Sequence, residues 1–528
     1  MTLNRIDKEF RHEGVSYLDY KQVEMDRALT AFLPRLWWNG QPSRIARSGD
    51  LGIEDFVELI EGRSEAFAGF DDSITRRWVE THLLDIVSRG KPNQAVAGLR
   101  PLHGFTYRLR NARRSRPYGA DEQLYEMLSH ASGDGGHVAL RMLKDFFFAG
   151  VDARTEAPRL GDDIDVETQA LISLSEAVRG QIADRAAGTP RRSYPPLYQQ
   201  AADHLADDVL RLLVHREFIP RTVLVEYLKI LFAFHLALYH MKIMKLLPAL
   251  VRGDQNASAG GEFFLDVTGL PDSAPARLAE RSAATWFGRI PSFVRATFTV
   301  KKLDDFAQHL ARRNLLPRPP GGIFGVSDLL PLLGPRYREE RLRYAAGRLS
   351  AIEDSRESGT DDDPTHAHLL QLGTDEFTTY IEVITYYRVR FHRQYLTECM
   401  DSLLLKNRSG AMIAQPRGGA RRFMLDSRLL EILLQLSLLD VDRRHGFYTR
   451  SLRIDQFLGL LRERYGLCVD RLPGGDGFGP AIVTDHAALR ENRTAFVARL
   501  REIGFYSNLS DAYLTQTITP RYTIEAGA

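Results

Sequence analysis

The stretch that decides the fold is TVLVEYLKILFAFHLALYHMKIMKLLPALV, residues 222–251. Apolar side chains occur on nearly every side of a helix drawn through it, so that helix has no polar face for water. Its longest run without a formal charge lies between Lys229 and Lys242. This run is shorter than the roughly 20 apolar residues that a bilayer span needs. We therefore predict a central helix buried in a bundle, with no membrane span.

Helical patterns continue outward from this stretch on both sides. In DDSITRRWVETHLLDIVSRGKP, residues 71–92, apolar side chains recur at three-to-four spacing, and Gly90 and Pro92 are suited to end a helix. The same reasoning predicts helices over residues 121–131, 137–149, 166–187 and 197–218. Strand patterns are few and lie at residues 262–268 and 512–518. The sequence predicts a mainly α protein with multi-helical N-terminal and central regions.

Loops rich in glycine, proline or charge indicate where the chain divides. GTPRRSYPP at residues 188–196 and the acidic DSRESGTDDDP at residues 354–364 have few apolar side chains to join a core. They predict four domains: an N-terminal helical domain over residues 1–190, a central helical domain with the long buried helix over 191–353, a helical connector over 365–425, and a C-terminal domain over 426–528.

The C-terminal domain has an ordered series of patterns. A leucine-rich helix at residues 426–440 precedes an extended stretch, GFYTRSL, and a second helix that Gly466 ends. A third helix at residues 486–503 is followed by FYSNLSDAYLTQTITPRYTIE, which is suited to a β-hairpin. Three helices followed by a two-stranded wing predict a winged-helix-like region. A helical cap with a terminal hairpin has the same order and is the alternative.

Composition restricts the classes of function. The net charge of +2 is far from that of a nucleic-acid coat protein, so any DNA contact must come from a local basic patch. Cys399 and Cys468 are too few for a cysteine-rich zinc site or a disulfide framework. The N-terminus is charged and lacks the apolar segment of a secretory signal. We expect reduced cysteines and a cytoplasmic location.

The densest basic stretch, YRLRNARRSRPY at residues 107–118, is the first candidate for DNA contact. Planar guanidinium groups bind two phosphate oxygens at once, and tyrosine rings stack on unpaired bases. The third tail helix would present further arginines to a groove. The predicted DNA-binding residues are Arg108, Arg110, Arg113, Arg114, Arg116, Arg490 and Arg493. Solvated arginines, or arginines paired with acids elsewhere in the fold, explain the same pattern without DNA.

No motif specifies an enzyme. The sequence has no Walker A lysine motif, no G-x-S-x-G elbow and no H-E-x-x-H. Asp7 followed by Asp19-x-Lys21 matches the order of acids and lysine in a restriction-type nuclease, where the acids hold a metal ion. That alternative requires Asp19 and Lys21 on a strand close to another acid.

Two histidine pairs are candidate metal ligands. His366 and His368 stand beside the acidic linker, and His235 and His240 are spaced so that they fall on different helix faces. Neither arrangement favours a metal site. We predict no catalytic residue, metal or cofactor.

Three stretches carry a resemblance to a known family. They are FRHEGVSYLDYK at residues 10–21, YRLRNARRSRPYG at 107–119, and the tail from LRERYGLCVD to LSDAYLTQTITPRY at 461–522. They resemble a component, without an assigned enzymatic domain, of bacterial methylation-associated antiphage defence systems. The resemblance implies work beside a DNA methyltransferase, a specificity subunit and ATPase or kinase partners, and it implies no catalytic residues.

Together, these features favour a non-catalytic component of a restriction-like defence system that confers phage resistance by binding DNA, partner defence proteins or both. The alternatives are a metal-dependent nuclease effector and a purely structural protein scaffold.

Overall fold

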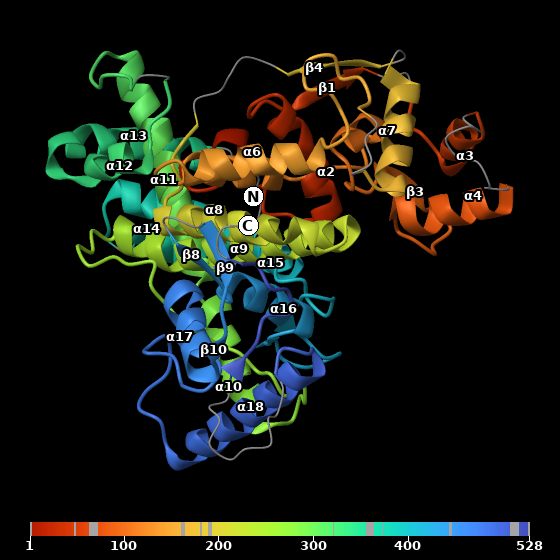
Figure 1. Cartoon of the computed structure of the whole chain (residues 1–528). Helices are drawn as coiled ribbons and strands as arrows, with labels where there is room; N and C mark the ends of the chain where they lie inside the picture. The colour runs from red at the N-terminus through yellow and green to blue at the C-terminus, as the bar shows by residue number, and fades with distance from the viewer. Residues whose placement is uncertain are drawn as a thin grey trace.

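The fold comes from a computed structural model that describes residues 3–46, 49–62, 72–159, 164–179, 182–187, 193–319, 322–354, 364–371, 373–442, 446–506 and 517–525. About 58% of the chain is helix and 8% is strand, which confirms the mainly α class. Within the described residues, the strands form two-stranded pairs only. Figure 1 shows helices layered around the middle of the molecule, with further helices extending to either side.

The long apolar stretch forms α9 (Arg221–Val251), which is buried along nearly its whole length. By length and composition it could cross a membrane, but 83% of its most apolar window is buried inside the protein. The prediction of a central buried helix is confirmed. Pro248 lies inside this helix, close to its last residue. The helices that pack on α9 are α2 (Met25–Trp37), α5 (Ala120–Ser129), α8 (Gln199–Val214), α11 (Ile290–Arg312), α15 (Glu376–Leu403) and α16 (Ser427–Ser437).

The N-terminal region places helices on one side of α8 and α9. Helix α6 packs on α8, and both run across the middle of Figure 1. The remaining helices here are α1 (Arg5–Lys8), α3 (Ile53–Glu61), α4 (Asp72–Trp78), α6 (Gly135–Phe147) and α7 (Val166–Arg179). Two antiparallel pairs complete the region: β1 (Ser43–Ala46) with β4 (Ala183–Ala186), and β2 (Leu84–Val87) with β3 (Ala95–Leu99).

Two sequence predictions in this region were wrong in their second halves. The helix predicted over residues 71–92 covers α4 and one π-helical turn, Val79–Leu83, and the chain then becomes β2. The helix predicted over residues 166–187 ends at Arg179 and is followed by β4. Strand β2 pairs with β3, which follows it closely in the chain, and β4 pairs with distant β1. In both cases the pairing supplies backbone hydrogen bonds, and β-branched Ile86 and Val87 suit it. Tertiary pairing therefore overrides the local helical pattern.

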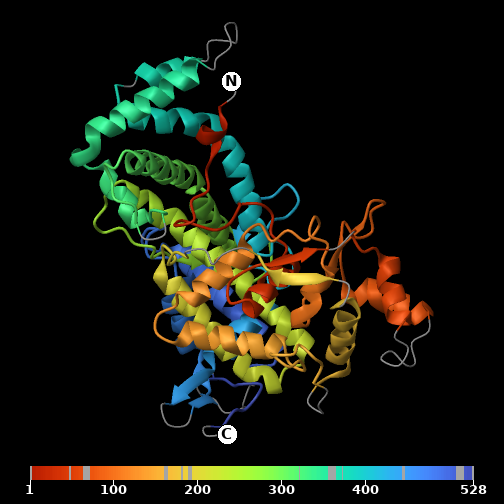
Figure 2. The same cartoon turned by 90° about the horizontal axis from the view of Figure 1, so that it is seen from above.

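The central region wraps the opposite side of α9. Figure 2 shows its helices, green to cyan, extending away from the N-terminal region. They are α10 (Ala274–Phe287), α11, α12 (Val326–Leu329), α13 (Arg338–Asp354), α14 (Pro364–Gln371) and α15. The short strands are β5 (Phe263–Phe264), β6 (Ile413–Ala414) and β7 (Arg422–Phe423), and β6 pairs with β7.

The four-domain division stays a prediction. Residues 188–192 and 355–363, where two of its boundaries fall, lie outside the described residues. One cluster of buried apolar side chains extends from Leu3 to Ile518.

The tail contains the expected helices in the expected order. Helix α16 is followed by a hairpin, then by α17, which ends at left-handed Gly466, and then by α18. The wing stays a prediction, because residues 507–516 are outside the described part of the chain. The tail elements are β8 (Leu439–Asp442), β9 (Gly446–Thr449), β10 (Leu452–Arg453), α17 (Ile454–Tyr465), β11 (Leu467–Cys468), α18 (Val483–Glu502) and β12 (Thr517–Ile518). Strand β12 pairs with β10, and β11 pairs in parallel with β5.

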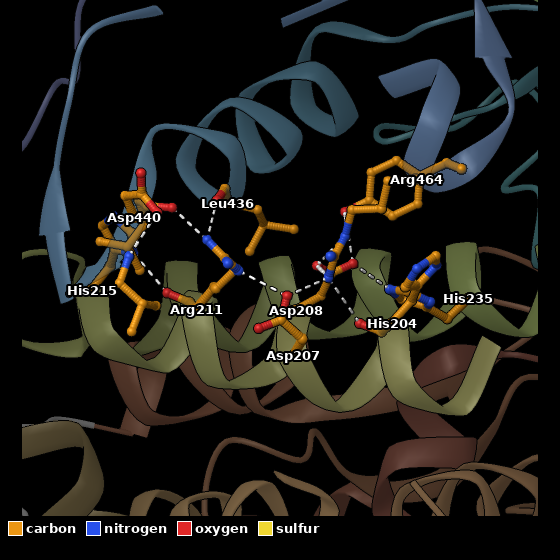
Figure 3. Close-up of polar contacts among 12 residues, drawn as sticks. His204, Asp207, Asp208, Arg211, His215, His235, Leu436, Asp440 and Arg464 are labelled. Atoms are coloured by element: carbon orange, nitrogen blue, oxygen red, sulfur yellow. Dashed lines mark hydrogen bonds and ion pairs between the residues drawn. The ribbon is translucent and has the colours of Figure 1, made fainter. Parts of the chain in front are cut away.

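A buried carboxylate joins α8, α9 and α17 (Figure 3). Asp208, fully buried on α8, accepts hydrogen bonds from His235 Nε2 at 2.8 Å and from Tyr465 Oη at 2.7 Å. Arg464 Nε donates to it at 3.1 Å. Burial by itself would raise the pKa of Asp208, but the His235 bond and the Arg464 charge bring that pKa below its usual value. The ionised carboxylate therefore holds α17, from the tail, against the consecutive helices α8 and α9.

Replacing Asp208 with Asn should destabilise the protein by about 3 kcal/mol, because Arg464 then loses its buried counter-charge. The neighbouring Asp207 also accepts from Arg464, but its side chain is 37% exposed. Asp207→Asn is thus a matched control that should cost less than about 1 kcal/mol. Urea unfolding of the two variants makes the comparison, and equal losses would contradict the central role of Asp208.

Buried histidines should make the fold sensitive to acid. Burial lowers the pKa of His103 to about 3 and that of His240 to about 4. The unfolded chain, with histidine pKa values near 6.5, takes up protons that these two side chains do not bind in the folded protein. The free energy of unfolding should therefore fall, by about 1.4 kcal/mol per pH unit per histidine, as the pH drops from about 6.5 towards 4. Glu126 has the opposite effect on stability, because burial raises its pKa to about 7 and the folded protein therefore binds this proton more readily than the unfolded chain.

The His240→Gln variant isolates one contribution. Urea unfolding is measured between about pH 6.5 and 5. Over this range the free energy of unfolding should depend less steeply on pH in the variant than in the unaltered protein, and the two slopes should differ by about 1.4 kcal/mol per pH unit. Identical slopes for the two proteins would contradict the prediction.

Candidate nucleic-acid interface

The arginine-rich stretch begins as a 3-10 helix (Gly104–Leu109) and continues into a tightly anchored turn. Asn111, which is buried, donates through Nδ2 to the carbonyl oxygens of Leu51 and Val96 at 2.8 and 2.9 Å. At the other end Gly119 has a φ of 83°, and a Cβ there would lie 2.0 Å from the Tyr17 carbonyl oxygen. Both ends of the turn are fixed, so the side chains between them project from a rigid backbone.

Two of the predicted arginines point into the protein. Arg108 is 3% exposed, lies over the Phe105 ring and pairs with Glu156 at 2.6 Å and Asp184 at 3.2 Å. Arg110 donates to the Ser43 carbonyl oxygen at 2.8 Å, and burial lowers its pKa. The prediction of DNA contact therefore does not fit Arg108, and Arg110 serves the packing of β1.

The other three arginines of the stretch are exposed. Arg113, Arg114 and Arg116 form no ion pair with any residue that the structure describes. Tyr118 follows them, and Lys21 Nζ lies 5.5 Å from the centre of its ring. We call Arg113, Arg114, Arg116, Tyr118 and Lys21 the basic turn.

Lys21 joins this group through a backbone contact that the sequence does not reveal. Asp19 N donates to the Tyr118 carbonyl oxygen at 2.9 Å, which brings residues 19–21 alongside the arginine turn. Sequence reasoning placed Lys21 only in the nuclease pattern. A lysine in an extended segment gives no local sign of a partner so far along the chain.

The basic turn is chemically suited to bind phosphates. Its four cations lie on an exposed surface, and within the described residues its three arginines have no carboxylate partner to displace. Guanidinium groups donate two parallel hydrogen bonds to phosphate oxygens, and the tyrosine ring adds a stacking surface.

The two arginines of helix α18 that were predicted to bind DNA differ in their surroundings. Arg490 is exposed and has no ion pair within the described part of the chain. Arg493 is engaged by Asp455 at 2.7 Å and by Asp470 at 3.4 Å. On the inner side, Asn492 is fully buried and donates to the carbonyl oxygens of Leu265 and Val469.

Asp7, Asp19 and Lys21 are not arranged as the nuclease alternative requires. Residues 19–21 form no strand, and Asp19 instead pairs with Arg11 at 2.9 Å on the surface. Asp7 is fully buried and accepts from Tyr380 Oη at 2.7 Å and from Arg348 Nη2 at 2.5 Å. The acids of the sequence pattern are thus committed to separate structural contacts, and the requirement of the nuclease alternative, Asp19 and Lys21 on a strand close to another acid, is not met.

The histidines and cysteines have structural surroundings where they are described. His235 bonds to Asp208, while His240 lies 2.8 Å from Ser16 Oγ, so the two face different neighbours as expected. The side chain of His366 lies outside the described residues. Cys399 and Cys468 are buried and unpaired, and burial raises both thiol pKa values. Among the described residues, no group of three or more His, Cys, Asp or Glu is placed to hold a metal ion.

Comparisons with known proteins identify the family. A family model described as methylation-associated defense system protein MAD7 matches residues 5–522, nearly the whole chain. No curated protein and no solved structure matched the chain. The match confirms the resemblance to a methylation-associated defence component. The chain belongs to the family of methylation-associated defense system protein MAD7.

Proposed function

We propose that this defence protein is a non-catalytic, cytoplasmic component that binds DNA through the basic turn and partner proteins through other surfaces. The observation that carries the proposal is the exposure of Arg113, Arg114 and Arg116 on a turn whose backbone is anchored at both ends. A fixed cluster of cations binds a polyanion without the entropic cost of ordering a loop. The family supports the context of defence, because its model is described as a methylation-associated defense system protein.

The tail would supply a further surface for DNA. We propose that α16, α17 and α18, with the β10–β12 pair, act as a winged-helix-like region. Its exposed Arg490 would approach a groove, and Arg493 would do so after releasing Asp455 and Asp470. The proposed partners are the methyltransferase, the specificity subunit and the ATPase or kinase of the same system.

Replacing Arg113, Arg114 and Arg116 together with Gln should weaken binding to DNA duplexes of different sequence by a similar factor. Phosphate contacts carry no base identity, so all sequences lose equally. The slope of log K against log salt should flatten by about 0.9 for each lost contact. Fluorescence anisotropy titrations at several salt concentrations measure both effects.

The matched control replaces Arg312, Arg313 and Arg318 with Gln. Arg312 ends α11, and Arg313 and Arg318 follow it; all three are exposed, and the change in net charge is identical. The control should leave affinity and salt slope nearly unchanged. Equal effects of the two triple variants, or none from either with the fold intact, would refute the interface and favour the structural scaffold. Affinity purification of partner proteins from phage-challenged cells would then be the direct test.

Replacing Arg490 with Gln should change sequence preference more than overall affinity, if α18 approaches base edges. Comparing duplexes that differ at single positions measures this. A uniform loss across all duplexes would place Arg490 on the phosphate backbone instead, and no loss would remove α18 from the interface.

A further inference from the structure

Helix α15 presents a surface of aromatic rings and arginines that the basic turn does not include. Its second half reads YYRVRFHRQY at residues 386–395. The side packed into the core carries His392 and Leu396. Phe391 and Tyr395, which are four residues apart, form a ridge on the side that faces away from the core, whereas Tyr387, one turn earlier, is partly buried against the core. We call Phe391 and Tyr395 the aromatic ridge.

The ridge is accessible and ordered by contacts of its own. Phe391 is 43% exposed, which is unusual for a phenylalanine, and Tyr386 beside the ridge is 38% exposed. The ring centres of Phe391 and Tyr395 lie 4.5 Å apart, and the Arg388 guanidinium lies 4.2 Å from the centre of Phe391. Part of this apolar surface therefore faces water in a defined arrangement.

The charges around the ridge identify the chemistry of its partner. Arg388, Arg390 and Arg393 form no ion pair with the residues that the structure describes. The nearby acids are otherwise engaged, since Glu382 pairs with Arg295 and Glu398 accepts from Gln394 at 2.9 Å. Exposed rings with uncompensated cations on both sides suit a ligand that is both anionic and aromatic.

Single-stranded DNA has both properties along its whole length. A duplex hides the faces of its bases in the stack, whereas an unpaired strand offers each face to a protein ring. The two ridge residues are separated by a rise of about 6 Å along the helix axis, so two bases could be stacked in series. Arginines on either side would then lie where the backbone phosphates run.

We propose that the aromatic ridge of α15 stacks on the bases of single-stranded DNA while Arg388, Arg390 and Arg393 contact its phosphates. The inference rests on the proposed function for the identity of the ligand as DNA, and it adds that the DNA is unpaired. Residues 10–23 link this surface to the basic turn. Phe10 stacks on His392 with ring centres 4.0 Å apart, and Val23 N donates to Ser402 Oγ at 3.0 Å.

The test measures binding of a labelled thymidylate oligomer and of a labelled duplex to the full chain. Phe391→Ala should weaken binding of the oligomer by about 10-fold, the loss of one stacked base, and leave duplex binding unchanged. Phe391→Trp should retain binding, since it keeps a stacking ring. Phe218→Ala is the matched control, because Phe218 is equally exposed, at 44%, but lies far along the chain beside Tyr522.

Arg390 and Arg393, replaced together with Gln, should flatten the salt dependence of oligomer binding by about 0.7 per lost phosphate contact. Unchanged oligomer affinity in Phe391→Ala, or an equal loss in Phe218→Ala, overturns the proposal. A uridylate oligomer that binds more tightly than thymidylate overturns the assignment to DNA.

The two proposals fail separately. If the Arg113, Arg114 and Arg116 variant loses duplex binding while Phe391→Ala retains the oligomer, the basic turn stands and the ridge falls. If the Arg113, Arg114 and Arg116 variant retains duplex binding while Phe391→Ala loses the oligomer, the ridge stands and the basic turn falls.

Discussion

Because helix α9 has no polar side, the rest of the chain has to enclose it. A surface helix needs neighbours along one stripe only, whereas α9 is covered by helices that begin as early as Met25 and end as late as Ser437. Enclosure of this kind removes a large apolar area from water, which is the main favourable contribution to folding. It also explains why one apolar cluster connects Leu3 with Ile518.

Enclosing an apolar rod leaves polar side chains with no water, and the protein pairs them across distant segments. His240 donates from Nδ1 to the Leu236 carbonyl oxygen and, being neutral, accepts from Ser16 through Nε2. On another side of α9, His235 donates to Asp208. These bonds fix the rotation of α9 relative to the N-terminal segment and to α8, which apolar packing alone would specify less tightly. The anchored backbone of the basic turn depends on the same N-terminal segment.

The sequence predicted the parts of the fold that are encoded locally. The burial of α9 follows from apolar residues on all sides, and the end of α17 follows from Gly466, whose φ is 80°. Strand β4 escaped prediction because its partner, β1, lies far away in the chain, and β2 because its residues continue the three-to-four apolar spacing of the helix before it. For the candidate site, the arginine-rich stretch was found, but the inward direction of Arg108 depends on Glu156 and Asp184. The aromatic ridge of α15 was missed because its spacing also fits a buried stripe, and only the fold shows which stripe is covered.

The enclosure of α9 also sets an order in time. During synthesis α9 leaves the ribosome before α11, α15 and α16 exist. At about 5–20 residues per second, the segment from Val251 to Ser437 takes roughly 10–40 s to complete. For that interval α9 has only half of its covering helices, namely α2, α5 and α8, and its remaining apolar surface is open to chaperones and to other nascent chains. Newly made copies of this protein therefore depend on cellular protection until α16, the last covering helix, has been made.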